Sequence, residues 1–263
     1  MTTPDSEVSE PQAAAWLVDR HLAYHRRQFA EPYRSTVHLG RFVHQILGVR
    51  CTRACAALDA GCGAGANIFH LSRVLPRTLW TGVDIAMDLF AVHRALVAEQ
   101  GGLNNAVNLI PGDFYNLPKL VEPGSFDLAF SIQTISWLDG YRDFLPQFLA
   151  MLRPGGVAFL TSLFTDFHVD ARTQITEYEE NGSPRTPMFY NIYSWNRFRD
   201  YCLALGAADV TAENFEIDTE LPPPAHLRMG TYTEPLADGR LLQRSGPLLM
   251  PWKAVAIQMP GGH

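Results

Sequence analysis

The chain has 263 residues, of which 47% are hydrophobic and 18% charged, an ordinary composition for a globular protein with one full hydrophobic core. Its 21 Lys and Arg residues and 27 Asp and Glu residues give a formal net charge of -6, so it lacks the basic footprint of a nucleic-acid binder. No apolar run is long enough to cross a bilayer, and the polar, acidic N-terminus lacks the apolar region of a secretory signal, so we expect a cytoplasmic protein without a membrane partner.

The N-terminal part is predicted to be a disordered tail followed by a helical cap. Residues 1–11 read as the tail, and residues 12–48 carry apolar side chains at helical spacing. Pro32 interrupts this pattern because proline has no backbone N–H, and Gly48 is a helix stop. We therefore divide the chain into a tail (1–11), a helical cap (12–50) and an α/β domain (51–263).

From Ala54 onward, short apolar runs alternate with helical patterns, which is typical of βαβ units and a parallel sheet. The apolar runs do not alternate strictly with polar residues, as expected for strands covered on both faces. The predicted strands are Ala56–Ala60, Leu79–Asp84, Val107–Ile110, Phe126–Ile132 and Val157–Leu163, and the predicted helices are Asn67–Val74, Met87–Gln100 and Tyr141–Leu152.

The regular alternation of strands and helices ends after the fifth strand. A predicted helix over Trp195–Leu205 precedes two strands, Val210–Ile217 and Ala254–Gln258, which we expect to pair antiparallel because no helical pattern separates them. Residues 165–194 and 221–251 read as insertions that act as lids or binding loops. The predicted fold class is a doubly wound α/β domain whose mostly parallel, seven-stranded sheet ends in an antiparallel strand pair.

The strongest local signal is Leu58-Asp59-Ala60-Gly61-Cys62-Gly63-Ala64-Gly65-Ala66, which a strand enters and a helix leaves. Alternate glycines let the backbone turn tightly and approach a ligand. The next strand ends in Asp84, whose carboxylate is suited to accept hydrogen bonds from two ribose hydroxyls. Both features also occur in dinucleotide-binding domains, so together they leave NAD and other adenosyl ligands open.

Two further carboxylates discriminate between these ligands. Asp113, after the third strand, is placed to accept a hydrogen bond from an adenine amino group, with Phe114 beside it. Asp59, two residues before Gly61, suits a ligand with an ammonium group and would repel a pyrophosphate. These positions favour a ligand that joins an adenosyl group to an amino acid.

The remaining elements complete a family pattern. The fourth strand reads Phe126-Asp127-Leu128-Ala129-Phe130-Ser131-Ile132-Gln133, and Met151-Leu152-Arg153-Pro154-Gly155-Gly156 forms a predicted turn before the fifth. In this turn we expect Pro154 to stop the preceding helix and the glycines to supply positive φ. This order resembles the class I S-adenosylmethionine (SAM)-dependent methyltransferases, closely over Leu58–Leu163 and through the final strand pair.

The resemblance implies a cofactor, SAM, and a set of residues that bind it. Its methionine end would lie at the loop residues Asp59, Gly61, Cys62, Gly63 and Gly65 and near Ser131, Ile132 and Gln133 at the end of the fourth strand. Asp84 would hold the ribose, and Ile85, Asp113 and Phe114 would hold the adenine. Tyr33 and Arg34, beside Pro32, are candidates for binding the SAM carboxylate or an anionic substrate.

A general base is harder to assign. Many small-molecule methyltransferases carry a His pair after the fourth strand, but this chain has Thr134-Ile135-Ser136-Trp137-Leu138 there. The remaining catalytic candidates are His168, Tyr33 and Tyr190. The four cysteines, Cys51, Cys55, Cys62 and Cys202, have neither zinc-site nor disulfide spacing, so we expect reduced thiols and no metal.

We therefore expect a SAM-dependent methyltransferase that acts on a small molecule, in a specialised biosynthetic pathway for a secondary metabolite or glycan precursor. Faint similarity of Gly230–Glu234 and Ser245–Trp252 to methyltransferases of such pathways supports the last point. A nucleic-acid or protein methyltransferase, an NAD-dependent oxidoreductase and a non-catalytic SAM-binding protein are the alternatives. The expected partner is a small-molecule substrate and not a nucleic acid, and the N-terminal helices leave a homodimer open.

Overall fold

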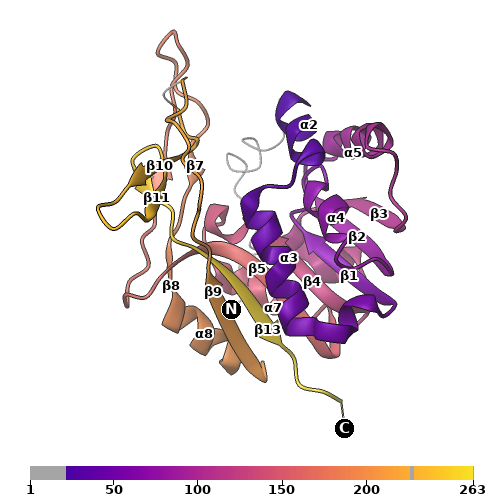
Figure 1. Cartoon of the computed structure of the whole chain (residues 1–263). Helices are drawn as coiled ribbons and strands as arrows, with labels where there is room; N and C mark the ends of the chain where they lie inside the picture. Colours follow the sequence, from indigo (N-terminus) through magenta and orange to yellow (C-terminus); the bar gives the residue numbers. More distant parts are fainter. Residues whose placement is uncertain (1–21, 226–227, 263) are drawn as a thin grey trace.

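The computed structural model describes residues 22–225 and 228–262 (Figure 1). Two helices of the cap lie in this part, α2 (Leu22–Ala30) and α3 (Arg34–Leu47), and the chain leaves helical conformation between them around Pro32. Gly48, at φ 53, ends α3 and leads into the short 3-10 helix η1 (Gly48–Thr52). The tail predicted for residues 1–11 lies outside the described residues.

A mixed β-sheet forms the centre of the molecule. Its strand order is β3-β2-β1-β4-β5-β13-β9, with parallel pairing up to β5 and β13 antiparallel to both of its neighbours. These strands are β1 (Cys55–Ala60), β2 (Thr78–Asp84), β3 (Val107–Pro111), β4 (Phe126–Ile132), β5 (Leu152–Thr165), β9 (Asp209–Asn214) and β13 (Trp252–Gln258). The predicted fold class and the antiparallel final pair are thus confirmed. One addition is β8 (Tyr193–Ser194), which pairs with the end of β5 and makes the sheet eight-stranded.

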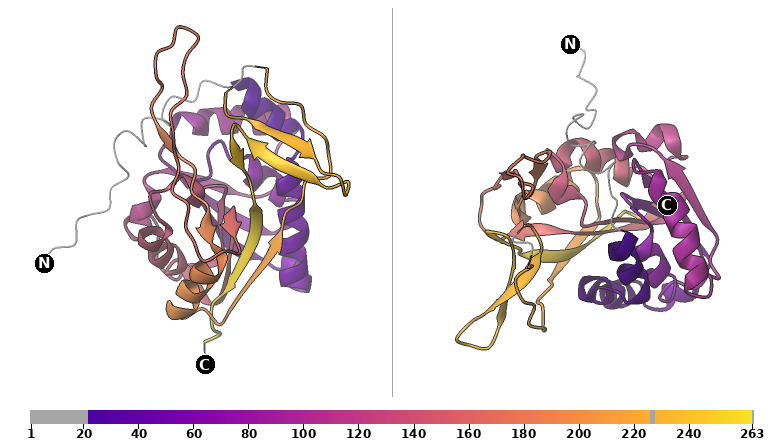
Figure 2. Two further views of the ribbon diagram at one scale, coloured as in Figure 1. Left: turned by 90° about the vertical axis from the view of Figure 1, so that its left-hand side faces the viewer. Right: turned by 90° about the horizontal axis from the view of Figure 1, so that it is seen from above.

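Helices cover both faces of the sheet, which makes the fold doubly wound (Figures 1 and 2). One face packs against α3, α4 (Ala66–Leu71) and α5 (Asp88–Glu99), and the other against α6 (Leu117–Leu120), α7 (Tyr141–Leu149) and α8 (Trp195–Ala204). On the first face, Phe130 stacks on Phe159 of the neighbouring strand at 5.3 Å between ring centroids, and both are fully buried. Truncating such a ring to alanine costs about 3–5 kcal/mol.

The segment before β5 differs from the predicted turn. Helix α7 already ends at Leu149, so Pro154 is not the residue that stops it, and the strand begins at Leu152. An irregularity in the pairing of β4 with β5 absorbs the extra residues, and Gly155 takes the expected positive φ of 75°. Gly156 does not have a positive φ. Its lack of a side chain instead leaves room for the carbonyl oxygen of Arg153, which would lie 2.9 Å from a Cβ.

Both predicted insertions rise from the same edge of the sheet. They follow β5 and β9, which run in the same direction as β1, β2 and β4, so they leave the sheet at its carboxyl edge. The first contains the strand pair β6 (Gln174–Ile175) and β7 (Met188–Phe189), and the second contains β10 (Thr231–Pro235), β11 (Leu241–Ser245) and β12 (Leu248–Leu249). Figure 2 shows these ribbons projecting beyond the helical layers. In the described part of the chain, no helix has the length and apolar character needed to cross a membrane.

Candidate functional site

A cavity of about 250 Å³ lies at the carboxyl edge of the sheet, where β1, β2 and β4 end. In open α/β sheets, ligands bind at this edge. The loop after β1 contributes Gly61, Cys62, Gly63 and Ala64, and the tip of β2 contributes Asp84, Ile85 and Ala86. Phe114, Ile132, Gln133, Thr134, Trp137 and Leu138 form a further wall, and Tyr24, His25 and Gln28 approach from α2.

The glycine loop has the conformation that its sequence predicts. Gly61, Gly63 and Gly65 have φ values of 81°, 53° and 78°, a region that other residues rarely adopt. A Cβ on Gly61 would lie 2.8 Å from Thr134, and one on Gly65 would lie 2.6 Å from His93. A Cβ on Gly63 would have no atom within 4 Å. The loop is therefore open to a ligand at Gly63.

Asp84 joins the loop to the second strand. Its Oδ2 accepts a hydrogen bond from the Gly63 N–H at 2.7 Å, and its Oδ1 accepts one from the Ala86 N–H at 2.9 Å. Burial raises the pKa of this carboxyl, and the hydrogen bonds from Ala86, Gly63 and Ile85 act against the rise. Because each carboxylate oxygen has two lone pairs, Asp84 retains acceptor capacity for a bound hydroxyl.

Asp59 lies in the strand below the loop, with 1% of its surface exposed. It does not itself form the cavity wall, and its buried Oδ1 has no hydrogen-bond partner among the described residues. Burial, and next the nearby charge of Asp84, raise the pKa of Asp59 to about 8. An unpaired buried carboxyl is costly for the fold, and a cationic ligand would supply the missing partner.

The end of β4 holds a strained residue. Gln133 has φ 57, the only positive φ of a non-glycine residue in the described chain. Its N–H donates to both the carbonyl and the hydroxyl of Thr161, and its amide donates to the Ser35 hydroxyl at 3.3 Å. Such strain is concentrated at functional sites.

Some of the predicted cofactor residues lie behind the cavity. Ser131 is fully buried, and Gly65 packs against His93, so neither reaches the lining. Asp113 also lies outside it, where its Oδ1 accepts the Tyr115 N–H at 2.9 Å and caps the 3-10 helix η2 (Phe114–Asn116). By capping η2, Asp113 positions Phe114, whose side chain lines the cavity.

The predicted substrate-side residues lie elsewhere. Arg34 pairs with Asp218 at 2.7 Å on the surface, because α3 packs alongside the segment after β9. Tyr33 precedes α3 and lies outside the cavity lining, with its ring centroid 6.3 Å from that of Tyr24, which does line the cavity. His168 is exposed and lies outside the cavity lining.

Tyr190 packs beside the cavity without lining it. Its ring centroid lies 3.9 Å from that of Trp137, and its hydroxyl bonds to Ser245. Burial raises the pKa of Tyr190 well above its usual range, which makes the hydroxyl a poor base. Its contact with Trp137 instead connects the first insertion to the cavity wall.

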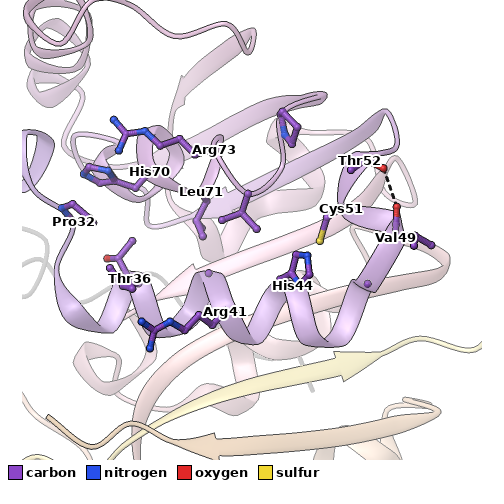
Figure 3. Close-up of a pocket in the computed structure, with 15 residues that line it drawn as sticks. Pro32, Thr36, Arg41, His44, Val49, Cys51, Thr52, His70, Leu71 and Arg73 are labelled. Atoms are coloured by element: carbon purple, nitrogen blue, oxygen red, sulfur yellow. Dashed lines mark hydrogen bonds between the residues drawn. The ribbon is translucent and has the colours of Figure 1, made fainter. Parts of the chain in front are cut away.

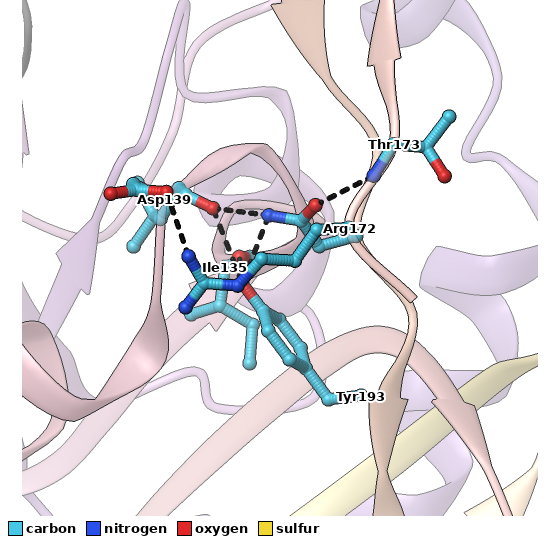
Figure 4. A network of polar contacts seen from close by, with 7 residues as sticks. Ile135, Asp139, Arg172, Thr173 and Tyr193 are labelled. Atoms are coloured by element: carbon cyan, nitrogen blue, oxygen red, sulfur yellow. Dashed lines mark hydrogen bonds and ion pairs between the residues drawn. The ribbon is translucent and has the colours of Figure 1, made fainter. Parts of the chain in front are cut away.

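A buried polar network fixes this connection (Figure 4). Asn191 donates to the Leu138 carbonyl at 2.6 Å, and the Tyr193 hydroxyl bonds to the carbonyls of Ile135 and Leu138 at 3.1 and 3.2 Å. Ile135 is the first residue of the 3-10 helix η3 (Ile135–Trp137), and Leu138 directly follows this helix. The first insertion therefore positions the segment that carries Trp137.

The contribution of α2 was not foreseen in detail. Tyr24, His25 and Gln28 share one helical face, and that spacing is visible in the sequence. The cavity also includes Asn67 and Thr134, which carry no motif that marks them. Only the packing of α2 against α4 and α5 brings its face to the glycine loop.

Comparisons with known proteins agree with this geometry. Residues 57–156 match the family model of a methyltransferase domain. This part of the chain is therefore similar to methyltransferase domains. Among curated proteins, the chain is similar to a malonyl-(acyl-carrier protein) O-methyltransferase from Enterobacter lignolyticus, with 32% identity over 117 residues that cover 43% of this chain and 41% of the other. The chain thus spans less than half the length of the curated relatives it matches.

Two solved structures share the fold of the methyltransferase domain. A Burkholderia thailandensis 1,6-didemethyltoxoflavin-N1-methyltransferase, bound to S-adenosylhomocysteine, superposes with a TM-score of 0.52 at 14% identity, covering 97% of this chain and 92% of that one. The (4+2)-cyclase SpnF superposes with a TM-score of 0.57 at 19% identity, covering 86% and 81%. Because the cyclase has the same fold, the fold alone does not define the reaction.

The cofactor of a methyltransferase domain of this class is SAM, and the residues present fit it. SAM carries an ammonium group, and the buried Asp59 Oδ1 has no partner among the described residues. The part of SAM that lies against the loop needs backbone without a side chain, and Gly63 provides this. The family model and the geometry of the cavity therefore agree.

Proposed function

We propose that this protein transfers the methyl group of SAM to a small-molecule acceptor in a specialised biosynthetic pathway. The observation that carries the proposal is that three features lie at or directly behind one cavity. These are the open glycine loop at Gly63, the Asp84 carboxylate at the tip of the second strand, and the unpaired buried carboxyl of Asp59. Asp59 disfavours NAD, because a pyrophosphate over the loop offers the unpaired oxygen of this buried carboxyl no cationic partner.

Residues in the cavity wall and directly behind it have proposed roles in holding SAM. Asp59 would pair with the ammonium group, and Asp84 would accept hydrogen bonds from the ribose through its remaining lone pairs. Ile85 and Phe114 would enclose the adenine, with Asp113 behind them. Ile132 and the strained Gln133 would lie along the methionine part, opposite Gly61 and Cys62.

The chain's part in the chemistry is orientation and exclusion of water. A sulfonium supplies its own leaving group, so the acceptor needs alignment more than activation. Among the described lining residues, His25 has the one imidazole, and burial raises the pKa of the Cys62 thiol well above its usual range. If the acceptor needs a base, His25 is better placed than His168.

A small-molecule acceptor is supported by the enclosure of the site. The cavity is walled by α2 on one side and by the segment around Trp137 on the other. Apolar side chains beneath the insertions continue from Trp137, with Leu163, Tyr190, Met250 and Trp252 buried there. The Burkholderia methyltransferase named above acts on 1,6-didemethyltoxoflavin, and a compact acceptor of this kind suits the cavity.

Ligand-dependent stability tests the proposal. At a concentration one hundred times its Kd, S-adenosylhomocysteine adds about 2.7 kcal/mol to the free energy of unfolding. At ~2–4 °C per kcal/mol for a domain of this size, the Tm rises by about 5–10 °C, whereas NAD leaves it unchanged. Asp84→Ala weakens binding of S-adenosylhomocysteine by about tenfold to a hundredfold.

Asp218→Ala is the matched control, because this exposed carboxylate pairs with Arg34 away from the cavity. Isotope-labelled SAM offered with a panel of metabolites then tests methyl transfer itself. Tight NAD binding without affinity for SAM would overturn the proposal. Cofactor binding without transfer to any small molecule in the panel would count against its acceptor class.

A further inference from the structure

A second and larger cavity, of about 1030 Å³, runs between α3 and the chain around α4 (Figure 3). The α3 wall carries Thr36, Gly40, Arg41 and His44, which share one helical face. The opposite wall carries His70, Leu71, Arg73 and Val74, and Val49 closes the far end. We call this feature the α3–α4 groove.

The floor of the groove is apolar and partly exposed. Gly40 brings the two walls close together, since a Cβ there would lie 3.3 Å from Val74 Cγ2. Val37 is 39% exposed and Val49 is 78% exposed, although most large apolar side chains of the chain are buried. The groove therefore offers apolar surface that the protein itself does not cover.

The groove is also cationic in an acidic protein. Residues 32–83 contain six arginines (Arg34, Arg41, Arg50, Arg53, Arg73 and Arg77) but only one acidic residue, Asp59, which is 1% exposed. Arg41 and Arg73, which lie on opposite walls of the groove, make no ion pair with any described residue. Arg26 and Arg34, outside it, are both paired with carboxylates.

We propose that the α3–α4 groove is a docking site for an acidic amphipathic helix of a partner protein. Such a helix would place its apolar stripe on Val37, Val49 and Val74 and its flanking carboxylates beside Arg41 and Arg73. The α3 wall extends from Thr36 to Gly48, which are twelve residues apart. This is about 18 Å along a helix, enough to contact about three turns of a docked helix.

Shape and chemistry favour this occupant over other anionic ones. A flat membrane surface does not reach the floor of a recess between two helices. A nucleic-acid backbone would use the arginines but gain nothing from an apolar floor. Hydrogen bonds of Thr36 with Asn67, at 2.8 Å, and of His70 with the Gln28 carbonyl, at 2.7 Å, separate the groove from the cofactor cavity. The groove and the cofactor cavity are thus separate sites.

A labelled synthetic peptide tests the groove in the full-length protein. The peptide has about 18 residues, with leucines at helical spacing flanked by glutamates, and a scrambled peptide of the same composition is its control. We expect saturable binding of the amphipathic peptide by fluorescence anisotropy, weakened by salt, and about tenfold weaker binding of the scrambled peptide. Arg41→Glu combined with Arg73→Glu should lower the affinity by about tenfold or more.

Arg199→Glu, on the exposed side of α8, is the matched charge control and should leave the affinity unchanged. If the double variant fails to fold, Val49→Gln provides the same test at an exposed site and should weaken binding by about threefold to tenfold. Equal binding of both peptides, or no effect of these variants, would overturn the proposal. Tighter binding of an RNA oligonucleotide or of anionic phospholipid vesicles, with displacement of the peptide, would also overturn it. The affinity for S-adenosylhomocysteine is measured alongside and should stay constant.

Discussion

The carboxyl of Asp59 combines deep burial, an unpaired oxygen and a pKa raised to about 8 by burial and by Asp84. At pH 7 it is therefore mostly protonated in the ligand-free protein. Pairing with an ammonium group requires the ionised form, so we expect SAM binding at pH 7 to release close to one proton. Calorimetry in buffers of different ionisation enthalpy measures this release, and Asp59→Asn should abolish it. A wild-type protein that binds SAM without proton release would contradict the proposed pairing.

Gly63 offers a test of close approach at the loop. Ala at this position meets no protein atom within 4 Å, so its cost is the positive φ of 53°, about 1–2 kcal/mol. A ligand lying over the loop would collide with the new methyl group. Gly63→Ala should therefore weaken SAM binding by about tenfold or more, the equivalent of ~1.4 kcal/mol.

Gly124→Ala is the control for this substitution. Gly124 has φ 66, also has no atom within 4 Å, and lies outside the cavity lining. It should lose similar stability in denaturant unfolding while keeping its affinity for SAM. Equal affinities of the two variants would mean that the cofactor does not approach Gly63.

At the scale of elements, the first insertion and η3 act as one unit. The bonds of Asn191 and Tyr193 hold η3 in place, and Tyr190 packs on Trp137 at the cavity wall. Trp137→Ala should raise the KM for the acceptor by about tenfold through loss of aromatic contact, while affinity for S-adenosylhomocysteine changes by less than about threefold.

Tyr190→Phe is the matched substitution. It keeps the ring contact with Trp137 and removes only the hydroxyl that bonds to Ser245, so turnover should stay within about threefold of the wild type. Steady-state kinetics with the acceptor found by the screen measure both variants. A collapse of kcat in Tyr190→Phe would restore the tyrosine as a catalytic candidate.

For the whole molecule, the raised pKa of Asp59 links ligand-free stability to pH. Its folded pKa of about 8 lies above the ordinary value of 3.8, so the native state binds more protons than the unfolded chain between these values. The free energy of unfolding contributed by this group therefore falls as pH rises from about 4 to 8. Asp59→Asn removes this loss, so its Tm should exceed that of the wild type increasingly as pH rises. Parallel Tm profiles from pH 5 to 9 would contradict the burial argument, and Asp200→Asn, at an exposed site, serves as control.

Much of the architecture followed from local chemistry. The apolar runs predicted four of the parallel strands to within one residue and the core of the fifth, whose start was missed by five residues, because buried strands need continuous hydrophobic sequence. The glycines predicted the positive φ values at Gly61, Gly63 and Gly65, since few other residues tolerate them. The segment before β5 was predicted less well, because proline and glycine fit a turn and an irregular strand equally.

What the sequence by itself determined is the fold class, the methyltransferase motifs and the bend of the loop after β1, because each depends on residues that are neighbours in the chain. Only the tertiary structure decided which side chains reach the cavity. It brings in Tyr24, His25 and Gln28 from α2 and leaves Arg34 with Asp218 and His168 exposed. The physical reason is that packing between helices and insertions far apart in the chain sets these positions, and no local periodicity encodes such packing.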